Sequence, residues 1–295
     1  MHAGPGAKKN LSLGAGLLFS ILWSSASTAT KIGLQVLQPF TICVVRFFTA
    51  GTVMIIISHL ILRQRLPKGR QWGQIAIYGL LANTIYLGLY VIAMRQVSAG
   101  LGSLAVATSP VFINLISAIF LRQRLRPVTI FCLFLCMGGV VIAAWPLLRN
   151  SSATPFGLLL LLISMVAYSI SVLYFSRTDW QGLTRLTING WQVFLGGVFL
   201  LPAMLYVYQS GLNVWGIRGL GAIGWLAIMV SVAAVSLWLF LLHEDAERSS
   251  FWLFLCPVFG FILSNIFTHE PLTLFTLAGM LLVLGGIYWQ QQVKK

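Results

Sequence analysis

Small polar and aromatic side chains recur at helical spacing in several strongly apolar segments of the chain. Together they offer hydrogen bonds and ring faces without net charge. Such a lining suits a neutral or zwitterionic ligand with an apolar body, held partly by stacking. It contains no basic cluster for phosphates. The candidate substrate-binding residues are Ser20, Trp23, Ser27, Tyr78, Asn83, Tyr86, Tyr90, Ser164, Tyr168, Ser171, Ser231, Trp238 and Trp252.

Apart from Tyr78 and Trp252, which are separate candidates, these residues form stripes that correspond between the two halves of the chain. Ser20 and Ser27 match Ser164 and Ser171 at one offset, with an aromatic residue between the serines in each copy. Residues three, four and seven apart share a helix face. We therefore expect each set to line one side of a helix.

A second pair of segments repeats the pattern. Asn83, Tyr86 and Tyr90 are predicted to share a face, and at an offset of 148 Asn83 and Tyr90 correspond to Ser231 and Trp238. We interpret the four stripes as the lining of a central cavity. The alternative is structural, because small and hydroxyl residues let membrane helices approach closely and Trp or Tyr anchor helices at the interface.

Arg46 is the one charged residue placed well inside a predicted membrane span. It lies about 10 Å from the outer end, at about 1.5 Å per residue. A charge within the membrane suggests function, here contact with a substrate carboxylate. Alternatively its side chain extends outward to the interface or holds helix-end carbonyls.

The five acidic residues all fall in turns or at span ends, and they are Asp179, Glu244, Asp245, Glu247 and Glu270. Proton-coupled transporters generally carry an ionisable relay within the bilayer. His59 and His243 lie near the ends of spans, where bulk water reaches them. The sequence therefore favours a facilitator that moves substrate down its gradient.

Composition fixes the class of protein. Hydrophobic residues make up 58% of the chain and charged residues 8%, against about 25% charged residues in soluble proteins. The net charge of +14 comes from short basic clusters between apolar runs, which are typical of topology signals rather than of nucleic-acid binding.

The apolar runs predict an all-α membrane protein with ten transmembrane helices. A span needs about 20 residues, and backbone groups in lipid must pair within the helix. The start of the chain imitates a secretory signal peptide, but we expect it to be the uncleaved first span. The predicted spans are 11–31, 39–62, 72–94, 98–121, 127–148, 155–176, 186–208, 217–242, 248–268 and 272–291.

One passage occurs twice. Residues 109–125 and 256–272 are identical at seven of seventeen positions at an offset of 147, including Pro110 with Pro257. A repeat at half the chain length indicates two copies of one unit, so we expect five-helix repeats in residues 1–150 and 151–295. The paired prolines break the helix hydrogen-bond ladder and are candidate gating hinges, or else static kinks.

The basic residues give the orientation. Of the nineteen Lys and Arg residues, Lys31, Arg95, Arg149 and Arg218 lie on one side of the predicted membrane, Arg46 lies within it, and the others lie on the side of the termini. The bias predicts that both termini are cytoplasmic. Since each half has an odd number of helices, the second repeat is expected to be inverted around a central cavity.

The chain resembles the EamA-type branch of the drug/metabolite transporter superfamily. The resemblance rests on Trp23-Ser24 with Lys31 in the first span, Arg46-Phe47 in the second, the Ser-Pro-Val-Phe passage and the late Gly pair of each half. The family usually has a Glu in both repeat turns, where this chain has Gln123 and Glu270. Within the family it is most similar to the YddG-type exporters of aromatic amino acids. The resemblance implies ten helices, a central cavity and export of small metabolites.

The patterns predict a membrane transporter for small neutral or zwitterionic metabolites that works by alternating access. The resemblance implies export of amino acids, including aromatic ones, across the bacterial inner membrane. The alternatives are a lipophilic-drug exporter and a proton-driven antiporter. The expected partners are a small-molecule substrate and membrane lipid, without nucleic acid, and we expect a monomer. We expect no catalytic residues, metal or cofactor, since the sequence has no H-E-x-x-H motif, Ser/His arrangement or paired intramembrane carboxylates.

Overall fold

The computed structural model describes residues 5–120, 127–149, 153–244 and 246–292, and it assigns only helices and their connections to them. The helices pair their own backbone groups, as lipid requires. In chain order they are α1 (Pro5–Gly33), α2 (Pro39–Ile56), η1 (Ile57–Ile61), α3 (Arg70–Gly79), η2 (Leu80–Ile85), α4 (Tyr86–Met94), α5 (Ala99–Ala107), α6 (Ser109–Phe120), α7 (Pro127–Arg149), α8 (Pro155–Arg177), α9 (Arg185–Val207), η3 (Ser210–Leu212), α10 (Ile217–Gly224), η4 (Trp225–Ala234), α11 (Val235–Glu244), α12 (Ala246–Thr268) and α13 (Leu274–Gln292).

Fewer helices are long enough to cross a membrane than the ten spans predicted. Within the described residues, seven helices are long and apolar enough to cross a membrane, and the bent pair α5–α6 gives an eighth. The segments Leu255–Thr268 and Leu274–Trp289 are shorter apolar helices of 10–17 residues. At about 1.5 Å per residue they cover less than the roughly 30 Å of a hydrocarbon core. The protein is thus an all-helical membrane protein with several spans.

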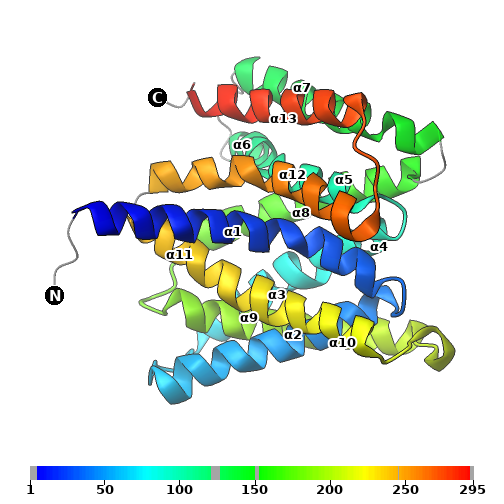
Figure 1. Cartoon of the computed structure of the whole chain (residues 1–295). Helices are drawn as coiled ribbons and strands as arrows, with labels where there is room; N and C mark the ends of the chain where they lie inside the picture. The colour runs from blue at the N-terminus through cyan, green and yellow to red at the C-terminus, as the bar shows by residue number, and fades with distance from the viewer. Residues whose placement is uncertain (1–4, 121–126, 150–152, 245, 293–295) are drawn as a thin grey trace.

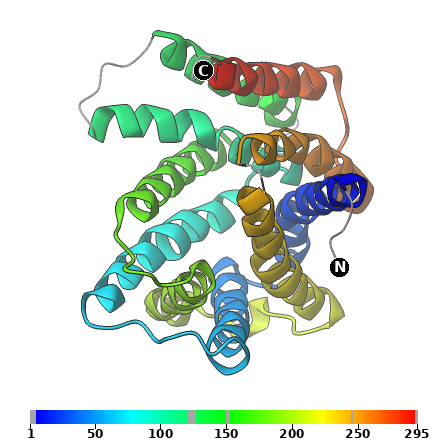
Figure 2. The ribbon, with the colours of Figure 1, turned by 90° about the vertical axis from the view of Figure 1, so that its left-hand side faces the viewer.

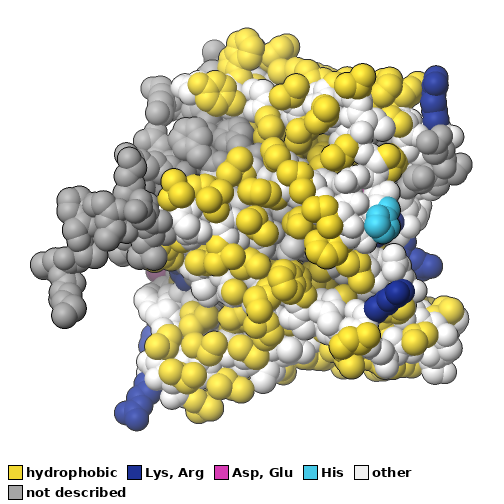
Figure 3. All heavy atoms as spheres, viewed as in Figure 1, with side chains coloured by type: hydrophobic (Ala, Val, Ile, Leu, Met, Phe, Trp, Pro, Cys, Tyr) yellow, Lys and Arg dark blue, Asp and Glu magenta, His cyan; other side chains and the backbone are white. Residues whose placement is uncertain are grey.

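The helices form two outer pairs around a middle group. In Figure 1, α7 and α13 lie at the top, α2 and α9 at the bottom, and α1, α8 and α12 between them. Figure 2 shows the same arrangement from the end at which α1 begins and α13 ends. Figure 3 shows hydrophobic side chains over most of one face, with Lys and Arg mainly along its left and right edges. Apolar sides with charged ends are what a bilayer requires.

Close glycine contacts join α7 to α13. A Cβ on Gly139 would lie 2.7 Å from the Gly279 carbonyl oxygen, and one on Gly286 would lie 2.9 Å from Cys136 Sγ. The contacts on α13 move back along the chain as those on α7 move forward, so the two helices are antiparallel. At the repeat offset, Gly139 corresponds to Gly286. Corresponding segments of the two halves therefore pack against each other.

The same relation holds for α2 and α9. A Cβ on Gly51 would lie 2.8 Å from the backbone nitrogen of Phe194, and one on Gly190 would lie 3.2 Å from that of Ile55. This pair is also antiparallel and also corresponds at the repeat offset. Small residues on both helices allow this close approach.

A third pair joins α5 to α12. Ser103 Oγ donates to the Cys256 carbonyl at 3.1 Å, and a Cβ on Gly100 would lie 3.1 Å from Ser264 Oγ. The contacts on α12 again move back along the chain as those on α5 move forward, so this pair is also antiparallel. All three pairs thus place like segments of the two halves in antiparallel contact.

Wider π-helical turns interrupt two corresponding spans. The segment η2 separates α3 from α4, and η4 separates α10 from α11. A π-helical turn holds more residues than an α-turn, so it shifts the angular position of every later side chain. Such segments occur often at functional sites.

The two repeat prolines have different surroundings. The axes of α5 and α6 meet at 45° across a break between Ala107 and Val111, next to Pro110, whose side chain lies outside the described residues. By contrast, α12 continues as one helix through Pro257. The helix assignment thus differs at the two prolines, and their role as gating hinges stays a prediction.

Candidate functional site

The four spans that carry the predicted stripes are α1, α3–η2–α4, α8 and α10–η4–α11, and they pack against each other in pairs. α1 packs along α10, η4 and α11, while α8 packs along η2 and α4. Each contact joins one half of the chain to the other. Residues on these helices are therefore placed where the halves meet.

Three tyrosines form a cluster between α4 and α8, which we call the tyrosine cluster: Tyr86, Tyr90 and Tyr168. The Tyr86 ring centroid lies 4.8 Å from that of Tyr168 and 6.1 Å from that of Tyr90. The Tyr90 hydroxyl shares a 2.9 Å hydrogen bond with Ser27 Oγ on α1. Sequence spacing thus identified four side chains that the structure brings together.

Arg46 lies beside this cluster. Its side chain is buried, with 8% of its surface exposed, and its Nε donates to Ser231 Oγ at 3.1 Å. Its helix α2 packs against α4, which carries Tyr86 and Tyr90. The bond to Ser231 joins α2 to η4 and keeps the guanidinium inside the protein rather than directed outward to the interface.

The tryptophans form a separate group around Phe19. The Phe19 ring stacks on Trp238 with a centroid distance of 4.9 Å and lies 5.7 Å from Trp23. Trp252 packs directly on Gly16 of α1, where a Cβ would collide with its indole. These contacts lock α1 to α11 and α12. Phe19 was missed from the sequence, although it lies one turn before Trp23.

The hydroxyls of three predicted serines are hydrogen-bonded to backbone carbonyls. Ser20 Oγ lies 2.9 Å from the Gly16 carbonyl and 2.8 Å from that of Trp252. Ser164 and Ser171 each donate within α8, to the carbonyls of Leu161 and Tyr168. All three side chains are buried. They serve helix packing in this state rather than presenting free hydroxyls.

Asn83 does not share a face with the tyrosine cluster, so that part of the prediction is wrong. Its side-chain amide donates to the Gln192 side chain and also to the Gln192 carbonyl at 3.3 Å. Asn83 therefore faces α9, while Tyr86 faces α8. The cause is η2, whose wider turn separates residues that an uninterrupted α-helix would align.

Tyr78 belongs to another aromatic group. Its ring centroid lies 5.1 Å from Phe175 and 6.1 Å from Trp180. These residues belong to the end of α8 and the connection to α9, with Ile75 and Ile188 packed against them. This group lies where α3 and α9 pack together, near one end of the bundle.

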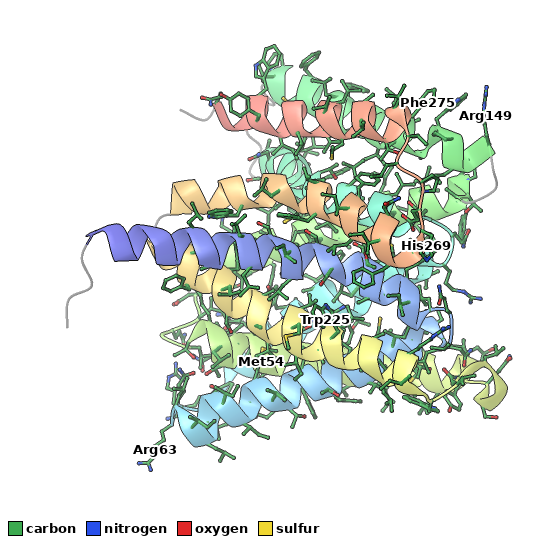
Figure 4. All side chains as sticks on the ribbon, in the orientation of Figure 1. Met54, Arg63, Arg149, Trp225, His269 and Phe275 are labelled. Atoms are coloured by element: carbon green, nitrogen blue, oxygen red, sulfur yellow. The ribbon has the colours of Figure 1, made fainter. Side chains whose placement is uncertain are left out.

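A polar arrangement that sequence reasoning missed lies at the end opposite the start of α1. Lys31 Nζ donates to the carbonyls of Met94 at 2.9 Å and Val97 at 2.7 Å. The Glu270 carboxylate accepts from the backbone nitrogens of Ala99 at 2.6 Å and Gly100 at 3.0 Å. We call these two residues the charged clamp. Figure 4 places His269, the neighbour of Glu270, at the same end as Arg149 and opposite Arg63.

The charged clamp follows simple electrostatics. A cation suits the carbonyls at the end of α4, and an anion suits the free amides at the start of α5. Together the two charges fix the turn between α4 and α5. Their position in the sequence, at a span end and in a short turn, was the available signal.

Known proteins are similar to this chain along most of its length. An uncharacterized transporter of Archaeoglobus fulgidus is 32% identical over 273 residues, covering 90% of this chain and 93% of that protein. The uncharacterized transporter YvbV of Bacillus subtilis is 26% identical, covering 90% and 87%. The uncharacterized inner membrane transporter YedA of Escherichia coli is 25% identical, covering 88% and 84%.

A solved crystal structure shares the fold, with a TM-score of 0.66 at 19% identity over 96% of this chain and 97% of the other. The model of the EamA-like transporter family matches twice, at residues 10–145 and 155–290. Together these matches cover nearly the whole sequence and agree with the helical membrane architecture. The chain belongs to the EamA-like transporter family.

Proposed function

We propose that this transporter exports small neutral or zwitterionic metabolites, most of all amino acids including aromatic ones. The observation that carries the proposal is the tyrosine cluster, on helices of both halves that pack together next to α2 with its buried Arg46. Ring faces and hydroxyls there offer stacking and hydrogen bonds to such a substrate. The resemblance to the YddG-type exporters supports the same substrate class.

Alternating access between two inverted repeats is the proposed mechanism. The repeats comprise residues 1–150 and 151–295, and each contributes five of ten spans. The antiparallel contacts of α2 with α9, α5 with α12 and α7 with α13 support this arrangement, because corresponding helices of inverted repeats run in opposite directions. The short apolar segments in α12 and α13 are the ninth and tenth spans.

The proposed membrane is the bacterial inner membrane, with both termini in the cytoplasm. The end at which α1 begins and α13 ends is then the cytoplasmic end (Figure 2). The excess of Lys and Arg on this side supports the orientation. The charged clamp lies at the outer end.

Facilitated diffusion is the proposed driving mode. The described carboxylates lie outside the tyrosine cluster, since Glu270 holds the start of α5 and Asp179 is exposed. His59 bonds the Gln64 carbonyl and Trp191 near the cytoplasmic end. The side chains of Glu244 and Glu247 lie outside the described residues, as does Asp245.

Proteoliposome flux tests the proposal. Purified protein is reconstituted, and efflux of labelled phenylalanine, tyrosine, alanine and threonine is measured with and without a pH gradient. We expect saturable efflux that an imposed pH gradient changes little. Strong stimulation by the gradient would instead establish a proton-driven antiporter. Transport of lipophilic dyes with no amino-acid flux would establish a drug exporter.

A further inference from the structure

Arg46 has only part of its hydrogen-bonding capacity used by the protein. A guanidinium carries five N–H groups, and within the described residues the protein accepts from its Nε alone, through Ser231. Arg46 keeps a small exposed fraction of 8%. Its two terminal nitrogens form the edge of a guanidinium that binds anions in bidentate fashion.

Ser231 holds the other edge in place. Its hydroxyl donates to the Leu226 carbonyl at 3.0 Å, so its lone pairs face the Nε of Arg46. The acceptor lies five residues earlier, within the π-helical segment η4. The wider turn of η4 thus gives Ser231 a fixed orientation. With Nε engaged, the hydrogen bond restrains the guanidinium, and within the described residues the edge formed by its two terminal nitrogens has no hydrogen-bond acceptor.

The buried charge has no carboxylate in contact among the described side chains. An unpaired cation inside a membrane protein is costly unless a counter-charge arrives. The hydroxyls of Tyr86 and Tyr90 offer dipoles, not a full negative charge. A substrate carboxylate would supply the missing charge and accept from the two free nitrogens.

The tyrosine cluster lies on helices next to the one that carries Arg46. Tyr86 packs against the Tyr168 ring, and its helix α4 packs against α2. A carboxylate at Arg46 would therefore place an apolar side chain against aromatic faces. We propose that Arg46 is the anchor for the substrate carboxylate and that Ser231 is its positioning residue. This inference rests on the proposed transport function and makes the carboxylate a required group of the substrate.

Ligand stabilisation in detergent tests the anchor without transport. Four ligands with the same phenyl group are compared by thermal shift and equilibrium binding: phenylalanine, 3-phenylpropionate, phenylalaninamide and phenethylamine. We expect the two carboxylates to bind at least about tenfold more tightly than the two compounds without a carboxylate. If no carboxylate binds more tightly than its uncharged or cationic analogue, the anchor is refuted.

Variants separate the roles of the two residues. Arg46→Gln should abolish the preference for carboxylates, while Arg46→Lys should retain part of it. Ser231→Ala should raise the Kd of the carboxylates by about threefold to tenfold, with little change for phenethylamine. Ser236→Ala is the matched control, because Ser236 lies on α11, is exposed and bonds only the Val232 carbonyl. Equal weakening of all four ligands by Ser231→Ala would overturn its positioning role.

The outcome also distinguishes this inference from the proposed function. If wild-type protein binds 3-phenylpropionate through Arg46 but exports no amino acid, the anchor stands and the amino-acid assignment fails. If amino acids are exported and Arg46→Gln keeps the carboxylate preference, the function stands and the anchor fails. Gel filtration and circular dichroism of each variant confirm that it is folded.

Discussion

The residues of the predicted stripes have two different roles in the structure. Tyr86, Tyr90 and Tyr168 meet in one cluster, whereas Ser20 and Ser164 hold backbone carbonyls. Sequence spacing identifies which residues share a helix face, but it does not distinguish a hydroxyl that bonds its own backbone from one that remains free. Hydroxyl groups in membrane helices often donate a hydrogen bond to a backbone carbonyl one turn earlier in the same helix. Aromatic rings cannot satisfy themselves on a backbone carbonyl in this way, and Tyr86 and Phe19 each also contact a ring on another helix.

Stacking against the tyrosine cluster predicts selectivity. Replacing Tyr86 with Leu should lower phenylalanine efflux about twofold to tenfold more than alanine efflux, because ring contacts contribute about 0.5–1.5 kcal/mol. Reconstituted flux of both amino acids measures the ratio. Tyr288→Leu on α13 is the control, since Tyr288 is exposed. Equal losses for both substrates would assign Tyr86 a structural role.

The Asn83–Gln192 contact predicts a coupling energy. Each amide is buried and bonds the other, so removal of one leaves a polar group unpaired at a cost of about 1–3 kcal/mol. Asn83→Ala and Gln192→Ala should each lower the melting temperature in detergent. The double variant should be less destabilised than the sum of the two. Additive effects would show that the contact contributes little.

At the level of elements, the sequence predicts the helices well but not their internal turns. Long apolar runs determine the positions of α1, α2, α7, α8 and α9, because lipid leaves the backbone no other choice. The segments η2 and η4 carry no such mark in composition. An assumed rotation of 100° per residue therefore placed Asn83 with Tyr86. The orientation of Asn83 depends on its tertiary contact with α9. A single sequence does not reveal such a contact.

Adjacent glycines on α7 allow a sharp test of the contact with α13. A Cβ on Gly139 would meet the Gly279 carbonyl, whereas one on Gly138 would have nothing within 4 Å. Gly139→Ala should destabilise the protein by about 1–3 kcal/mol through overpacking. Gly138→Ala should be neutral or slightly stabilising. Thermal melting of both variants in one detergent checks the difference, and equal melting temperatures would contradict the packing described.

At the level of the whole molecule, the charged clamp ties α1, the α4–α5 turn and the α12–α13 turn together at one end. Lys31→Met should loosen this end, because the carbonyls of Met94 and Val97 lose their cationic partner. A cysteine introduced at Thr30, which is 1% exposed, should then react several times faster with a maleimide applied from that side.

The control for the clamp is Arg95→Met. Arg95 is an exposed cation at the end of α4, so it tests loss of charge without loss of the clamp. The four native cysteines, Cys43, Cys132, Cys136 and Cys256, are buried and free, which keeps the background labelling low. Unchanged reactivity at position 30 in Lys31→Met would show that the clamp does not limit opening.

The charged clamp also makes the two ends of the transporter energetically unequal. At the offset that relates Ser20 to Ser164, the counterpart of Lys31 is Phe175, and at the offset of 147 the counterpart of Glu270 is Gln123. Neither carries a charge, so these two positions cannot form the charge-assisted hydrogen bonds that reinforce closing of the clamped end. In a carrier with no external energy source, a difference in the free energy of closing the two ends cannot change the final substrate gradient. It does determine which conformation the empty protein favours. We therefore expect the empty protein to rest with its binding site facing the end where α1 begins.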